Sequence, residues 1–193
     1  MKKLPIGIQS FKVIREDSYY YVDKTKFIKE LVTTGKYFIL SRPRRFGKSV
    51  FLDTLRRAFQ GEEEYFTDLF LSNNWDWSTS HPVIYISFGA GATRSVDDLK
   101  YTIKAILLQL RNTYEFSYDN VTIKDQFFEA IQKINKIVGR QVVILVDEYD
   151  KPILDRIEDK EEAMIIREEL KNFYSVIKDA DEYLKFVLLT AVT

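Results

Sequence analysis

The tripeptide Gly47-Lys48-Ser49 contains the residue types that proteins use to bind phosphate groups. It ends a short loop that follows the apolar residues 37–40, and a helical pattern begins directly after it. In such a layout the lysine ammonium reaches the outer phosphates of a nucleotide, the serine hydroxyl reaches Mg²⁺, and the backbone N–H groups of the loop point at the anion. The tripeptide therefore predicts the phosphate-binding loop, or Walker A motif, of a protein that binds ATP.

The first half of this loop departs from the usual pattern. The pattern G-x-x-x-x-G-K-[ST] has a glycine where this chain has Arg42, and Pro43 removes one backbone N–H group. Arg44 and Arg45 could compensate by charge-assisted hydrogen bonds to phosphate oxygens, or they could contact nucleic acid or form a solvated basic loop. The expected nucleotide-binding residues are Arg44, Arg45, Phe46, Gly47, Lys48, Ser49 and Val50.

A second motif supports the first. The segment QVVILV at residues 141–146, apolar from Val142 on, runs straight into Asp147-Glu148, which is the layout of a Walker B strand. We expect Asp147 and Ser49 to serve Mg²⁺, and Glu148 to act as the general base that activates water. Lys48 is the second expected catalytic residue, because its charge would stabilise the reacting phosphates.

Each of these residues also has a purely structural interpretation. The glycine-lysine-serine sequence could be an ordinary helix start with a hydroxyl cap, and Asp147-Glu148 could be a solvated strand end. The two motifs together, in order and each at a strand end, favour the nucleotide site. Thr190 or Thr193 could supply a hydroxyl that senses the γ-phosphate, although a β-branched residue also suits a strand. For Asp150 we favour a helix-capping role over catalysis.

Strands and helices are expected to alternate along the chain, which predicts an α/β fold with three layers and a mainly parallel sheet. The expected strands, all buried on both faces, are residues 37–41, 82–88, 141–146 and 185–192. The expected helices are residues 27–34, 48–60, 96–110, 122–137 and 161–177, with a further short helix and loop in residues 62–80. Residues 1–36 form a lead segment with two short strands, at 11–14 and 19–22, and residues 37–193 form the core.

Composition excludes several classes of protein. The 193 residues carry no net charge and 15% are aromatic, so neither a disordered chain nor a broadly basic nucleic-acid-binding surface is expected. Cysteine is absent, which rules out disulfides and thiolate metal sites. No apolar run is long enough for a membrane span, and the first residues do not resemble a signal peptide, so we expect a cytoplasmic protein without a membrane partner.

Three segments of the chain resemble the AAA-ATPase-like family. They are LPIGIQSF at residues 4–11, YVDKT at 21–25 and SRPRRFGKS at 41–49, and the family also has a segment similar to the Asp-Glu-Tyr-Asp of residues 147–150. Arginine at position 42 fits this family, whereas Ala191 stands where the family usually has glycine. The resemblance implies a P-loop NTPase of the additional-strand catalytic-glutamate type, with strand order 5-1-4-3-2. Its fifth strand would be absent here, because the core is expected to be truncated after the fourth strand.

Three functions stay open from the sequence. The first is ATP binding with Mg²⁺-dependent hydrolysis. The second is a nucleotide-dependent regulatory switch with little hydrolysis, whose output passes through a missing C-terminal nuclease-like domain that the resemblance implies, with nucleic acid as a candidate partner. The third is a nucleic-acid-binding module that uses Arg42, Arg44, Arg45, Arg56 and Arg57. Assembly into a homo-oligomer is compatible with each of them.

Overall fold

A parallel sheet with strand order β1-β4-β3-β2 forms the centre of the chain. The computed structural model describes residues 2–192, and within them the sheet consists of β1 (Tyr37–Ser41), β2 (Val83–Ser87), β3 (Val142–Asp147) and β4 (Leu184–Ala191). The expected α/β fold with a parallel sheet is confirmed. The last strand along the chain lies between β1 and β3, which is the arrangement that the resemblance implied.

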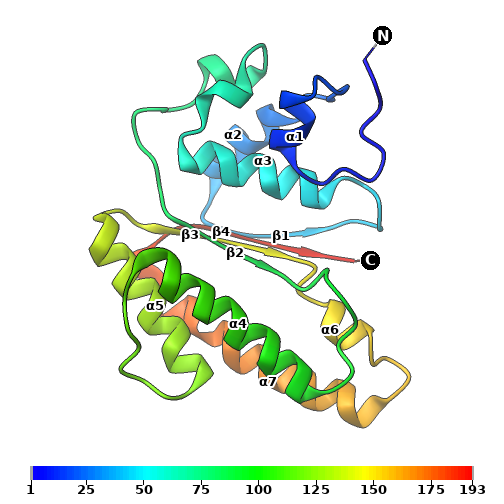
Figure 1. Cartoon of the computed structure of the whole chain (residues 1–193), viewed down its shortest axis with the longest axis vertical. Helices are drawn as coiled ribbons and strands as arrows, with labels where there is room; N and C mark the ends of the chain where they lie inside the picture. Colours follow the sequence, from blue (N-terminus) through cyan, green and yellow to red (C-terminus); the bar gives the residue numbers. More distant parts are fainter. Residues whose placement is uncertain (1, 193) are drawn as a thin grey trace.

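Helices cover both faces of the sheet and complete the three layers (Figure 1). One face carries α1 (Phe11–Glu16), α2 (Thr25–Thr34) and α3 (Lys48–Gln60), and the other carries α4 (Val96–Tyr114), α5 (Ile123–Val138) and α7 (Lys160–Asp179). The short elements are η1 (Glu63–Phe66), η2 (Phe70–Asn73), α6 (Lys151–Leu154) and η3 (Asp181–Tyr183). Both ends of the described chain lie on the side to which the strands point.

Two apolar clusters hold these layers together, one on each face of the sheet. Successive side chains of a strand point to opposite faces, so Val143 and Leu145 of β3 join the cluster beneath α3, whereas Val142, Ile144 and Val146 join the cluster beneath α4, α5 and α7. All five side chains are fully buried. The middle of the sheet is therefore rigidly packed, and it fixes the positions of the strand ends.

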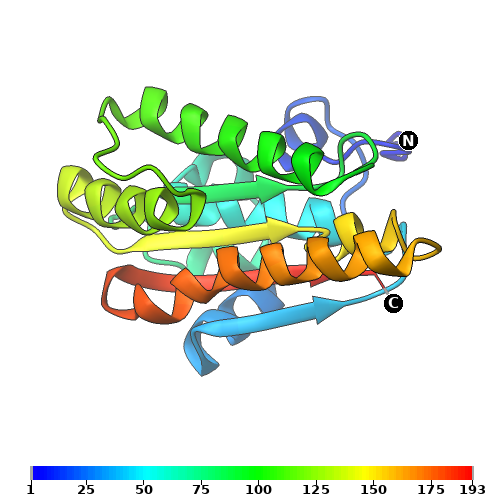
Figure 2. The ribbon, with the colours of Figure 1, turned by 90° about the horizontal axis from the view of Figure 1, so that it is seen from below.

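Strand β1 corrects the prediction that every strand is buried on both faces. It is an edge strand, and Tyr37 and Ile39 remain 46% and 66% exposed on the face away from α3. Figure 2 shows the reason, because α7 crosses over β4 and leaves β1 outside the helical layer. Phe38 and Leu40, which point the other way, pack on the α3 side.

The two short strands predicted in the lead segment are also wrong. Residues 11–16 form α1 instead, and residues 19–22 pair with no strand of the described chain. Ser10 caps this helix by accepting a hydrogen bond from the Val13 N–H group. Phe11 packs against the ring of Phe66, and its N–H group donates to Asp53 of α3, so contacts with the core hold α1 in addition to its own cap.

Among residues 2–192, no helix combines the length and the apolar character needed to cross a membrane.

Candidate functional site

The loop between β1 and α3 has the backbone of an anion-binding turn. At its start the Arg42 N–H group donates to the Ala191 carbonyl at 3.4 Å, which extends the pairing of β1 with β4 by one step. Arg45 and Gly47 then adopt φ angles of +67° and +77°, in the left-handed region that glycine occupies at no steric cost. These two residues turn the chain sharply from the strand end into the first turn of α3.

The N–H groups of residues 44–50 donate no hydrogen bond of normal geometry within the described chain, although residues 44–45 lie in a turn. The first backbone bond of normal geometry after Arg42 is donated by Phe51, to the Gly47 carbonyl. The preceding N–H groups belong to the loop and to the first turn of α3, and no acceptor in residues 2–192 meets them at hydrogen-bonding distance and angle. A run of free N–H groups at a helix start is the arrangement that binds phosphate oxygens.

Lys48 is buried at the centre of this loop. Lys48 is only 6% exposed, and its Nζ donates to the carbonyl oxygens of Arg42 and Pro43 at 2.8 and 3.0 Å. Within residues 2–192 it forms no ion pair with a carboxylate. An ammonium group that is buried without a counter-charge is costly, and an anion bound in the loop would remove that cost.

The remaining loop residues lie around Lys48 at the surface. Ser49 and Val50 are half-buried in the first turn of α3, and Phe46 is 63% exposed. Arg42, Arg44 and Arg45 are exposed, and none of them is in an ion pair within the described residues. The loop thus presents a local positive charge on a chain whose net charge is zero.

Asp147 lies at the end of β3 and is held by Thr190 of β4. Asp147 is two residues after Leu145, and alternate side chains of a strand point to the same face. Its side chain therefore points to the side of the sheet on which α3 lies. The Thr190 hydroxyl, fully buried, donates to Asp147 Oδ1 at 2.7 Å. Because β4 separates β1 from β3, Thr190 lies on the strand between the one that leads into the loop of Lys48 and the one that carries Asp147.

Glu148 is fixed by its backbone and lies beside the end of β2. Its φ angle is +55°, unusual for a residue with a side chain, and its N–H group donates to the Thr190 hydroxyl at 3.0 Å. A methyl group built on Gly89 would lie 3.5 Å from Glu148 Oε2. The Glu148 carboxylate therefore lies close to the backbone of Gly89, just after the end of β2.

Tyr85 and Arg56 link Asp147 to α3. Burial raises the pKa of the Tyr85 hydroxyl, and the carboxylates of Asp147 and Asp53 add to this rise. The Arg56 guanidinium lies 5.1 Å from the centre of the Tyr85 ring and also pairs with Asp53. Arg57 is held at 2.7 Å by Glu62, so neither arginine extends freely from α3.

The residues expected to bind Mg²⁺ fit that ion only in combination with a nucleotide. Among the described residues no group of three or more acidic, histidine or cysteine side chains gathers to form a metal cage. Mg²⁺ commonly takes one or two protein oxygens and completes its shell with water and phosphate oxygens. The Ser49 hydroxyl and the Asp147 carboxylate are suitable donors of this kind, and a bound Mg²⁺ would neutralise charge on the phosphates.

Asp150 corrects the prediction of a helix cap. It occupies the position before α6, but its side chain makes no capping hydrogen bond there. Its two carboxylate oxygens instead accept the Val192 N–H group, at 3.2 and 3.0 Å. Asp150 therefore ties the segment after β3 to the segment after β4. Thr193, the alternative sensor residue, lies outside the described residues.

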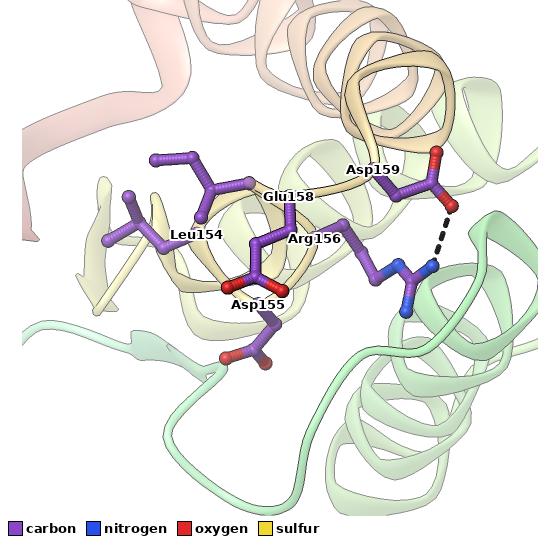
Figure 3. Close-up of a pocket in the computed structure, with 6 residues that line it drawn as sticks. Leu154, Asp155, Arg156, Glu158 and Asp159 are labelled. Atoms are coloured by element: carbon purple, nitrogen blue, oxygen red, sulfur yellow. Dashed lines mark hydrogen bonds and ion pairs between the residues drawn. The ribbon is translucent and has the colours of Figure 1, made fainter.

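A hollow of about 550 Å³ in the loop between α6 and α7 does not belong to this site (Figure 3). It is lined by consecutive residues, 154–159, and three of their polar side chains are engaged with other groups of the protein. Asp155 binds Lys151 and the Thr93 N–H group, and Asp159 caps α7 and pairs with Arg156. These interactions stabilise the loop itself.

Several features of the site were not predicted from the sequence motifs. They are the bridge from Thr190 to Asp147 and Glu148, the closeness of Gly89 to Glu148, and the position of Lys24 near Gly47. Lys24 lies in the YVDKT segment that carries the resemblance, and this is the one signal that could have found it. The role of Thr190 as a γ-phosphate sensor stays a prediction, because its hydroxyl is occupied by Asp147 and Glu148 in this structure.

Comparison with known proteins identifies the family of the chain. A sequence model of the AAA-ATPase-like family, described as a predicted AAA-ATPase, matches residues 5–193. The chain is also 48% identical over its full 193 residues to an "Uncharacterized protein in vnfD 5'region" of Azotobacter chroococcum mcd 1, and it spans 37% of that protein's length. The chain therefore belongs to the AAA-ATPase-like family, whose description supports a nucleotide-binding ATPase.

Proposed function

We propose that this domain binds ATP in the loop between β1 and α3 and hydrolyses it with the help of Mg²⁺. The observation that carries the proposal is the loop itself. The N–H groups of residues 44–50 are unpaired, and they surround a buried lysine that has no counter-charge within the described chain. A triphosphate would supply both the acceptors for these N–H groups and the negative charge for Lys48.

In the proposed reaction each residue has a separate task. Lys48 stabilises negative charge on the phosphates, and Ser49 and Asp147 hold Mg²⁺. Glu148 accepts a hydrogen bond from the attacking water and takes its proton as the water reaches the γ-phosphate. Thr190 orients the Asp147 carboxylate and the Glu148 backbone, so it positions both acidic residues.

Binding is tested by isothermal titration of ATP and Mg²⁺ into the wild type and Lys48→Met. The variant should lose at least about tenfold in affinity, because it removes a charged hydrogen-bond donor. Lys104→Met, which removes one exposed charge from α4 on the opposite face, is the matched control and should bind like the wild type. Equal affinities of all three proteins would refute a phosphate site at Lys48.

Hydrolysis is tested by phosphate release from the wild type and Glu148→Gln. Loss of a general base commonly costs about 10²- to 10⁴-fold in rate, and ATP affinity should be retained. Equal turnover of the two proteins would instead favour the regulatory switch, in which ATP is bound and barely hydrolysed. The left-handed backbone of Glu148 is the observation that keeps this second function open, since strained residues occur in switch segments as well as in active sites.

The arginines of the loop are proposed to bind phosphate. Arg44 and Arg45 are exposed beside the free N–H groups, and their guanidinium groups could form charge-assisted hydrogen bonds that Arg42 and Pro43 do not supply through their backbone. Unchanged ATP affinity in both Arg44→Ala and Arg45→Ala would contradict this role. The nucleic-acid-binding alternative is weakened at two of its five residues, because the side chains of Arg56 and Arg57 are held in ion pairs.

A further inference from the structure

Lys24 lies beside the phosphate-binding loop, although it belongs to the lead segment before β1. A methyl group built on Gly47 would lie 3.9 Å from Lys24 Nζ, and apart from the neighbours of Gly47 along the chain no other described atom would be as close. Gly47 directly precedes Lys48 and belongs to the run of unpaired N–H groups. A second ammonium group, from a different part of the chain, therefore lies near the place where phosphate is proposed to bind.

The backbone on both sides of Lys24 is firmly anchored. Asp23 accepts hydrogen bonds from the Thr25 N–H and hydroxyl groups at 2.8 and 2.7 Å, and from the Phe70 N–H group at 2.7 Å. Thr25 is fully buried, and its hydroxyl oxygen accepts the Leu71 N–H group at 3.1 Å. The bonds of Asp23 and Thr25 to η2 thus fix the backbone position of Lys24, whose exposed side chain places Nζ near Gly47.

The Lys24 ammonium has no partner within residues 2–192. It forms no ion pair and donates no hydrogen bond there, whereas Lys26, in the first turn of α2, lies 3.9 Å from the carboxylate of Glu30. Lys48 is occupied by the carbonyls of Arg42 and Pro43. The described part of the loop thus combines free N–H groups with an unpaired ammonium, and it has no carboxylate within ion-pair distance of either lysine. This combination is suited to a ligand with several negative charges.

We propose that Lys24 is a second phosphate-binding lysine, which donates a charge-assisted hydrogen bond to the phosphate chain of the bound nucleotide. The inference rests on the proposed ATP site and adds to it one phosphate-binding residue from the lead segment. The lead segment would then contribute directly to the site, because η2 fixes the backbone on both sides of Lys24, whose ammonium group lies near the loop. Lys24 then compensates in part for the arginine that replaces glycine at position 42 and for the missing N–H group of Pro43.

The test is isothermal titration of ATP and of inorganic tripolyphosphate, both with Mg²⁺, into four proteins at one salt concentration. These are the wild type, Lys24→Met, Lys24→Arg and the control Lys26→Met, which removes an equal charge two residues away. Lys24→Met should lower the affinity for both ATP and tripolyphosphate by about tenfold or more, because it removes a hydrogen bond between charged groups. Lys24→Arg should stay within about threefold of the wild type, and Lys26→Met within about twofold.

Each outcome decides the inference. If Lys24→Met binds ATP as tightly as Lys26→Met, while Lys48→Met in the titration described above has lost binding, Lys24 is not a phosphate ligand, but the proposed ATP site stands. If the wild type binds neither ATP nor tripolyphosphate, the proposed site and the inference both fail. Thermal melting without ligand reports any loss of folding in Lys24→Met. In that case Lys24→Arg decides, because recovered affinity supports the role of the positive charge and lost affinity overturns it.

Discussion

The buried hydroxyl of Thr190 offers a sharp test of how the acidic residues are positioned. The change Thr190→Val keeps the shape of the side chain and removes only its polar group. In the wild type that hydroxyl donates to Asp147 Oδ1 at 2.7 Å and accepts the Glu148 N–H group at 3.0 Å. Thr190 is fully buried, so water cannot readily replace either bond.

The expected loss of stability follows from these two bonds. A hydrogen bond to a charged group contributes about 1.5–3 kcal/mol, and leaving the half-buried Glu148 N–H group unpaired costs about 1 kcal/mol more. We therefore expect Thr190→Val to lower the free energy of unfolding by about 2.5–4 kcal/mol. That is a large part of the roughly 5–15 kcal/mol that stabilises a typical domain.

Urea unfolding followed by circular dichroism measures this difference, with Thr190→Ser as the matched control. Serine keeps the hydroxyl and lacks one methyl group, which should cost about 1 kcal/mol. The valine variant should thus unfold at a clearly lower urea concentration than the serine variant, with an unchanged slope of the transition. If valine proves as stable as serine, the hydroxyl does not hold Asp147 and Glu148 as described.

Three further predictions concern groups outside the loop. Tyr174 has a buried hydroxyl without a hydrogen-bond partner in the described chain, so Tyr174→Phe should leave stability unchanged or raise it by about 1 kcal/mol in thermal melts, and a loss would reveal a missing partner. Burial alone would raise the pKa of Glu129, but hydrogen bonds from Lys133 and from two backbone N–H groups lower it from 4.5 to about 2. Its carboxylate therefore stabilises the fold above pH 4.5, and up to about 3 kcal/mol of the free energy of unfolding is lost as the pH falls from 4.5 through 2. Urea unfolding at a series of pH values should show this loss in the wild type but not in Glu129→Gln. Ile39 is 66% exposed on the edge strand, so the wild type should self-associate in sedimentation experiments and Ile39→Lys should not; a wild type that stays monomeric at high concentration would contradict edge pairing.

The parts of the fold that the sequence predicts are those with strong local signals. Each strand is recognisable because a run of β-branched and aliphatic residues lies between polar or glycine-containing turns. Helix α3 has the bounds that the sequence predicts, since Gly47 and Gly61 mark its ends with left-handed backbone, which glycine adopts readily. The two motifs of the candidate site are also local, because each consists of adjacent residues at a strand end.

The failures depend on interactions between distant residues. The apolar residues 11–14 fit a short strand or a short helix equally well, and the bond from the Phe11 N–H group to Asp53 favours the helix. Exposure of Tyr37 and Ile39 depends on the position of α7, which no periodicity in β1 reveals. The bond of Thr190 to Asp147 arises from the register between β3 and β4, and Lys24 reaches Gly47 through the fold of the lead segment.

The position of β4 also sets the order in which the domain can assemble during synthesis. Strand β1 pairs only with β4 among the described strands, so Tyr37 cannot pair with Val187 until that residue has left the ribosome. Until then β2 and β3 can join, but the loop of Lys48 and the carboxylate of Asp147 belong to halves of the sheet that are not yet connected. Such non-local pairing slows folding, so nascent chains should acquire affinity for a nucleotide only in the last step, when β4 inserts and joins the two halves.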